Sequence, residues 1–121
     1  MFPEYWERFV RDNNLVGVNI EIDEESDLSN LGFDLKILSS EESVDEATNC
    51  YPGIVAAKKQ YVPVASCLEG SGDWYYINTL DGALGPVYRI YHDSVEGDKL
   101  EDDGVEMVLK SYEELTTYTR P

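Results

Sequence analysis

Apolar side chains recur at helical spacing near the start of the chain. They fall on one stripe of a helix, with charged residues opposite, and comprise Phe2, Tyr5, Trp6, Phe9 and Val10. Pro3 suits the first turn of a helix, where its missing N–H is harmless, and the pair Asn13 and Asn14 favours a stop. We therefore predict an amphipathic helix at residues 3–13 that packs on a core.

Two capping boxes predict further helices. Ser39 and Glu42 have the spacing at which the serine side chain accepts from an amide of the first turn while the glutamate accepts from the cap amide. The helix that follows is predicted to end near Asn49. Ser111 and Glu114 repeat the spacing and predict a final helix. Three of its residues are expected to face inward: Tyr112, Leu115 and Tyr118.

Alternating apolar and polar residues, and short apolar runs rich in β-branched and aromatic residues, predict strands. The predicted strands cover residues 18–22, 61–68, 73–80, 86–92 and 105–110. A short connection with two glycines at residues 81–85 favours antiparallel pairing of the strands on either side. The sequence does not decide the secondary structure of two segments. Residues 28–38 fit a turn or loop that leads into an extended segment, and residues 54–59 fit a loop or a short helix.

Length and composition predict one folded domain. The chain has 121 residues, of which 42% are hydrophobic and 12% aromatic, which is too apolar for a disordered chain. A chain of this length buries roughly 65% of the surface that its unfolded form exposes. We predict a single α+β domain over residues 1–121, with a mostly antiparallel twisted sheet flanked by helices.

Acidic residues dominate the charge. Aspartate and glutamate total 25 against 9 lysines and arginines, so the formal net charge is −16. Such a surface repels phosphates, which disfavours binding to bare nucleic acid. The acidic segments 21–27, 41–46 and 96–106 would instead steer a positively charged protein into contact. A purely solubilising role for these charges is the alternative.

Few residues suit metal, redox or membrane chemistry. Cys50 and Cys67 are far apart in the sequence and lack clustered histidines, so we expect two buried free thiols. The aspartates within residues 98–103 lack the spacing of a calcium loop. We therefore expect neither a metal nor a cofactor. No apolar run approaches the length of a membrane helix, and we expect a cytoplasmic, reduced environment without membrane contact.

Two glycine-punctuated segments carry the most information about family. They read Gly-Ser-Gly-Asp-Trp-Tyr-Tyr-Ile at residues 70–77 and Gly-Pro-Val-Tyr-Arg-Ile-Tyr-His-Asp at residues 85–93. Glycine permits backbone conformations that side chains forbid, and the aromatic and β-branched residues that follow favour strands. With the two capping boxes, this ordered set over residues 39–118 resembles the SUKH superfamily, the Smi/Knr-like domain. That superfamily contains bacterial immunity proteins and fungal cell-wall regulators.

Aromatic and acidic residues gather on these two strands and just after them. The candidates for contact with a protein partner are Trp74, Tyr76, Tyr88, Tyr91, Asp93, Glu96 and Asp98. Exposed aromatic rings offer a large rigid contact area, and flanking carboxylates select a basic partner. Strand alternation sends about half of the aromatic rings into the core. The sequence leaves open which half.

His92 is the only histidine, and an acid–base enzyme would have to use it together with Asp93. No nucleophile in a recognisable motif accompanies the pair, and such a pair at a strand end commonly closes a turn. Asp73 is likewise expected to cap the bend at residues 70–72, which lacks the lysine of a phosphate-binding loop. We predict no catalytic residue and no enzymatic activity.

The resemblance implies a non-catalytic protein-binding domain. The expected function is that of an immunity protein, which neutralises a polymorphic or contact-dependent bacterial toxin by binding and occluding it. A nuclease is one candidate toxin, and its basic surface would match the acidic chain. The protein itself is expected to be a monomer or a weak homodimer. The alternative, implied by the fungal members, is a regulatory or scaffolding module without a toxin partner.

Overall fold

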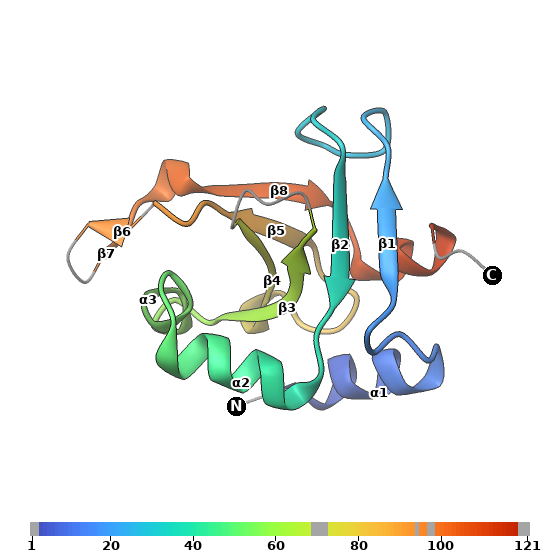
Figure 1. Ribbon diagram of the computed structural model, residues 1–121, viewed down its shortest axis with the longest axis horizontal. Helices are drawn as coiled ribbons and strands as arrows, with labels where there is room; N and C mark the ends of the chain where they lie inside the picture. The colour runs from blue at the N-terminus through green and yellow to red at the C-terminus, as the bar shows by residue number, and fades with distance from the viewer. Residues whose placement is uncertain (1–2, 69–72, 94, 97–98, 119–121) are drawn as a thin grey trace.

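The computed structural model describes residues 3–68, 73–93, 95–96 and 99–118, and its centre is a six-stranded antiparallel sheet (Figure 1). The strands follow the order β1-β2-β3-β4-β5-β8, so most neighbours in the sheet are also neighbours in the chain. Their bounds are β1 (Asn19–Ile22), β2 (Phe33–Ile37), β3 (Tyr61–Cys67), β4 (Trp74–Asn78), β5 (Val87–Ile90) and β8 (Val105–Leu109). A separate hairpin of β6 (Val95–Glu96) and β7 (Lys99–Leu100) lies between β5 and β8 in the sequence.

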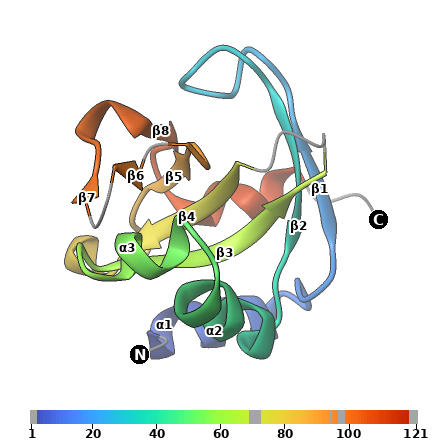
Figure 2. The same ribbon diagram turned by 60° about the vertical axis from the view of Figure 1, so that its left-hand side comes forward.

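The sheet curls into a half-barrel, and its concave side holds the larger core (Figures 1 and 2). Helix α1 (Glu4–Asp12) contributes Trp6 and Val10 to this core. The 3₁₀ helix η3 (Tyr112–Thr117) contributes Tyr112 and Leu115. The Trp6 and Tyr112 rings meet edge to face with centroids 5.1 Å apart, a favoured geometry for aromatic pairs, so the two ends of the chain pack together.

Helices and the small hairpin cover the convex side. Helix α2 (Ser40–Asn49) packs on β3 and on α3 (Gly53–Ala57), and the chain passes between the two helices through a cis Tyr51–Pro52 peptide bond. A second core cluster lies between α3, β4, β5 and β7. It comprises Val55, Ala56, Tyr76, Ile90 and Leu100.

These observations confirm the α+β prediction. Helix α1 occupies the predicted segment with Pro3 as its N-cap, and both capping boxes are present, at Ser39 and at Ser111. The structure also decides the secondary structure of the two segments that the sequence left undecided. Residues 28–38 form a loop followed by β2, and residues 54–59 contain most of the short helix α3.

Three details differ from the sequence-based expectations. The strand predicted at residues 73–80 ends at Asn78, because the Asn78 side chain accepts a hydrogen bond from the Leu80 N–H and begins the 3₁₀ turn η1 (Thr79–Asp81). The final helix is of the 3₁₀ type. Strict alternation also fails in β8, where a bulge in the pairing with β5 leaves both Val108 and Leu109 buried.

Candidate functional site

Of the aromatic residues predicted to contact a partner, one is buried in the core and the others are half-buried. Tyr76 is 0% exposed in the second core cluster, so the prediction that it contacts a partner is wrong. Its neighbour Tyr75 is buried as well, because it stacks on Phe33 in the other core with centroids 4.7 Å apart. Consecutive strand residues are normally split between core and solvent, but here both faces of the sheet are covered.

The remaining predicted aromatic residues are half-buried. Trp74 packs against the second core cluster. The Tyr88 hydroxyl donates to Asp81 at 2.9 Å, and the Tyr91 hydroxyl donates to Glu106 at 2.9 Å. Burial and these carboxylate contacts raise the pKa of both tyrosines above its ordinary value. Both hydroxyl groups are therefore already hydrogen-bonded within the chain.

The acidic members of the predicted surface have different outcomes. Asp93 is exposed just after β5. Glu96 belongs to β6, but its side chain is outside the described part of the structure, and so are Asp98 and the bend at residues 70–72.

His92 interacts with Asp73, which precedes β4. The backbone N–H of His92 donates to the Asp73 carboxylate at 2.8 Å, and the His92 Nδ1 lies 2.8 Å from the same oxygen. The hydrogen bond to Asp73 is the main cause of the raised pKa of His92, with further contributions from the charges of Asp73 and Asp93. Asp73 thus fixes the position of a chain segment that follows a neighbouring strand.

A buried ion cluster, which the sequence reasoning missed, joins the β1–β2 loop to the sheet. Arg89 on β5 is 5% exposed and lies 3.6 Å from Asp27, 3.1 Å from Glu106 and 3.0 Å from the Ser29 hydroxyl. Asp27 is 1% exposed and accepts hydrogen bonds from the amides of Ser29 and Gly32. A charged residue in the middle of an apolar strand was the signal that a buried carboxylate must lie nearby.

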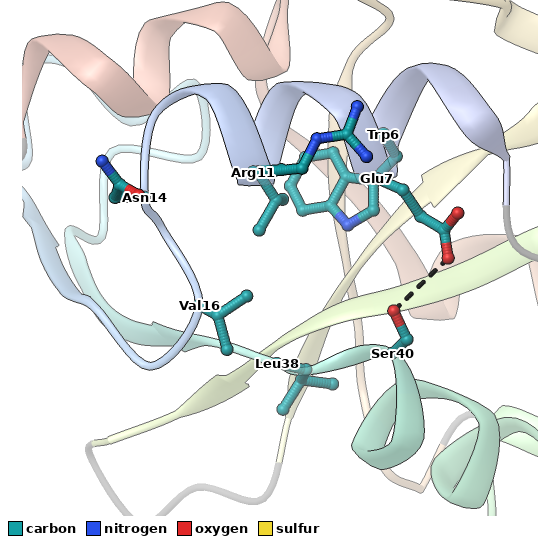
Figure 3. A pocket seen from close by; sticks show the side chains of 8 residues that line it. Trp6, Glu7, Arg11, Asn14, Val16, Leu38 and Ser40 are labelled. Atoms are coloured by element: carbon teal, nitrogen blue, oxygen red, sulfur yellow. Dashed lines mark hydrogen bonds between the residues drawn. The ribbon is translucent and has the colours of Figure 1, made fainter.

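A groove of about 570 Å³ lies between α1 and the start of α2 (Figure 3). Its apolar lining comes from Trp6, Val10, Val16 and Leu38, and its polar lining from Glu7, Arg11, Asn14 and Ser40. Ser40 donates to Glu7 at 3.4 Å and so connects the two helices at one end of the groove. The volume lies within the range of ligand and anchor-residue pockets.

Sequence reasoning did not find this groove, because its lining comes from two stretches that lie apart in the sequence, residues 6–16 and 38–40. Trp6 and Val10 were assigned to the core, which is correct, since they are 1% and 5% exposed. Val16 carried the one local signal. It is an apolar residue just after the predicted end of the first helix, and it is 57% exposed at the groove edge.

Other kinds of site receive little support from the described residues. In this part of the chain no three or more histidine, cysteine, aspartate or glutamate side chains are grouped to hold a metal ion. Cys50 and Cys67 are free thiols, and both are half-buried rather than fully buried. None of the described helices has the length and apolar character needed to cross a membrane.

Comparisons with family models, with curated proteins and with solved structures find no match for this chain. The resemblance to the SUKH superfamily therefore stays a prediction that rests on the motifs of residues 39–118.

Proposed function

We propose that this protein is a non-catalytic protein-binding domain that neutralises a bacterial toxin with a basic surface by covering that surface. The motif resemblance supplies the class of function. The sign of the surface charge is the structural observation that supports it most directly.

Some of the nine cations of the chain are already paired with carboxylates of the same chain. Arg89 is buried between Asp27 and Glu106, and Arg8 is paired with Glu4 along α1 at 2.9 Å. Exposed carboxylates meanwhile lie on several elements: Glu21, Asp23, Glu24 and Glu25 at the β1–β2 hairpin, Glu41 and Asp45 on α2, and Glu101 and Asp103 before β8. The field around the protein is therefore strongly negative.

This field matches the chemistry of a toxin that acts on nucleic acid. Such an enzyme needs a basic groove to hold phosphates, and an anionic protein can occupy that groove in their place. Inhibition then requires tight binding and occlusion but no catalytic group. Long-range attraction also speeds association when the salt concentration is low.

The test is a binding and activity assay with the toxin-like protein encoded beside this gene. We expect the two purified proteins to form a complex, the toxin to lose activity at equimolar ratio, and the association rate to fall steeply as salt increases. A toxin that binds equally well at all salt concentrations would contradict the electrostatic part. The absence of binding to any neighbouring gene product would favour the regulatory or scaffolding alternative.

Two matched double variants distinguish the long-range electrostatic field of the protein from local contacts in the interface. Glu24→Gln with Glu25→Gln, and Glu101→Gln with Asp103→Asn, each remove two exposed carboxylates from different parts of the molecule. If the overall field steers association, both pairs should slow association to a similar extent and leave dissociation unchanged. A faster dissociation for one pair would place that segment inside the interface.

A further inference from the structure

The groove between α1 and α2 contains a hydrogen-bond donor that the described chain does not use. Trp6 is 1% exposed, and contacts with Phe9 and Tyr112 hold its ring. Among the described residues its indole N–H has no hydrogen-bond partner, and Figure 3 shows the indole nitrogen on the ring edge that faces Leu38 and Ser40. This N–H is not among the fully buried polar atoms that lack a partner, so it is accessible at the groove wall and can donate to a ligand that enters the groove.

Val16 forms an apolar edge of the same groove and is held there by the backbone. The Gly17 N–H donates to Ile37 at 2.9 Å, and the Val18 N–H donates to Leu15 at 2.9 Å. These bonds fix the turn on both sides of Val16, which nevertheless stays 57% exposed. Val16 therefore adds preformed apolar surface to the groove, and little ordering is needed when a ligand binds.

The groove adjoins a second hollow of about 420 Å³, which is shallow and open and is lined only by the outer side of α2. Ser40 lines both, and the second is further lined by Glu41, Val44, Asp45, Thr48 and Asn49. Val44 is 40% exposed. The combined surface thus presents two exposed apolar side chains, Val16 and Val44, and exposed carboxylates from Glu7 on α1 to Asp45 on α2. Arg11 lies at the α1 side.

We propose that this combined groove binds a segment of a protein partner in which apolar side chains alternate with lysine or arginine. The apolar side chains occupy the two hollows, a backbone carbonyl accepts from the Trp6 indole N–H, and the cations face Glu7, Glu41 and Asp45. The inference rests on the proposed function, since it names the surface through which the basic partner binds.

Charge complementarity selects this occupant over the alternatives. An acidic segment would bring its carboxylates against those of α1 and α2, inside a chain of net charge −16. A second copy of this chain carries the same charge and meets the same repulsion. A purely apolar segment would leave the carboxylates at the rim without partners.

The two tryptophans of the chain allow a direct test by NMR on the isotope-labelled full-length protein. Their indole N–H signals are assigned with the Trp74→Phe variant, because Trp74 packs on the other side of the sheet. The probe is the peptide acetyl-Lys-Leu-Gly-Leu-Lys-amide. We expect it to shift the Trp6 indole signal in a saturable way and to leave the Trp74 signal in place.

Two further peptides test the chemistry. Replacing both leucines by serine, or both lysines by glutamate, should raise the peptide concentration needed for a half-maximal shift of the Trp6 signal at least tenfold. A Trp6 signal that stays unmoved by the first peptide at millimolar concentration overturns the proposal. Equal binding of the glutamate peptide overturns the choice of a basic partner.

Matched variants locate the site. Val16→Asp should weaken binding of the first peptide about tenfold, because it places a charge on the apolar edge. Leu31→Asp is the control, since Leu31 is 61% exposed on the β1–β2 loop and adds the same charge away from the groove. An unchanged Trp74 signal shows that each variant folds. A weaker complex with Leu31→Asp but not with Val16→Asp would move the site to the hairpin and refute the groove.

The peptide titration is independent of any toxin. If the peptides bind but no neighbouring toxin is neutralised, the groove stands and the proposed function fails. If the toxin is neutralised equally by the wild type and by Val16→Asp, the function stands and the groove is not its binding surface.

Discussion

Arg89 lies inside the molecule although arginine is among the least buried residue types. Two carboxylates and the Ser29 hydroxyl satisfy part of its guanidinium, and the Phe33 and Tyr75 rings lie 5.5 and 5.6 Å from its Cζ. Burial alone would lower the pKa of Arg89, but the hydrogen bonds that its guanidinium donates to neighbouring side chains and the charge of Asp27 outweigh burial and raise the pKa. The guanidinium therefore stays charged at all pH values at which the fold exists.

Removing this charge should strongly destabilise the protein. Arg89→Met leaves the buried Asp27 carboxylate without its cation, and we expect the free energy of unfolding in urea to fall by about 3–5 kcal/mol. Arg11→Met is the control, because Arg11 is exposed on α1, and its effect should stay within about 0.5 kcal/mol. The double variant Arg89→Met with Asp27→Asn should lose less than the sum of the two single changes. Full additivity would show that the pair does not interact.

The contact between His92 and Asp73 predicts a titration in the neutral range. The pKa of His92 is raised above its ordinary value of about 6.5, so the stabilising effect of the contact is complete below that pH. It is lost as the pH rises through the raised folded value. We expect the proton NMR signal of this single histidine to titrate with a midpoint above 6.5, and Asp73→Asn to lower that midpoint. A midpoint unaffected by Asp73→Asn would contradict the role given to the hydrogen bond.

At the scale of elements, the packing of α2 on α3 depends on the absence of a side chain at Gly53. A Cβ at this position would overlap the backbone carbonyl group of Glu46 on α2. The two helices are therefore closer than any other residue at position 53 would allow. This close approach places α3 over β4 and buries Tyr76, which explains why a tyrosine predicted to face a partner became part of the core.

Gly53→Ala tests this close approach. In an exposed helix the change from glycine to alanine would stabilise by about 1 kcal/mol, but here we expect a loss of about 1–3 kcal/mol in the free energy of unfolding, because α2 must move away. Gly82→Ala is the comparison. Gly82 has a positive φ of 73°, and a Cβ at this position would meet no atom within 4 Å, so its variant reports conformational strain without overlap. A Gly53→Ala protein as stable as the wild type would show that the helices adjust freely.

At the scale of the whole molecule, the β1–β2 loop partly closes the half-barrel. The Leu28 N–H donates to the Val108 carbonyl at 2.9 Å, and Asp27 lies in the ion cluster with Arg89, so the loop is joined to β8 and β5. This closure buries Arg89 together with Asp27 and leaves the carboxylates of residues 23–25 exposed. The loop that completes the fold thus presents carboxylates to solvent at residues 23–25, which suits the proposed neutralisation of a basic toxin.

Elements with local causes can be predicted from the amino-acid sequence alone. The amphipathic stripe predicted α1, the spacing of Ser39 and Glu42 predicted α2, and the glycine-punctuated aromatic runs predicted β4 and β5. Each of these depends on residues a few positions apart, so periodicity and capping chemistry suffice.

The covered faces of the sheet and the contacts between distant segments depend on the complete fold. Alternation along β4 could not show that α3 lies over Tyr76, and no local pattern placed Asp27 beside Arg89 or Val16 beside Trp6 and Leu38. These contacts join segments far apart in the sequence through the curl of the sheet and the packing of the helices on it. Burial, ion pairing and the groove therefore follow from the whole fold, while the elements follow from their own residues.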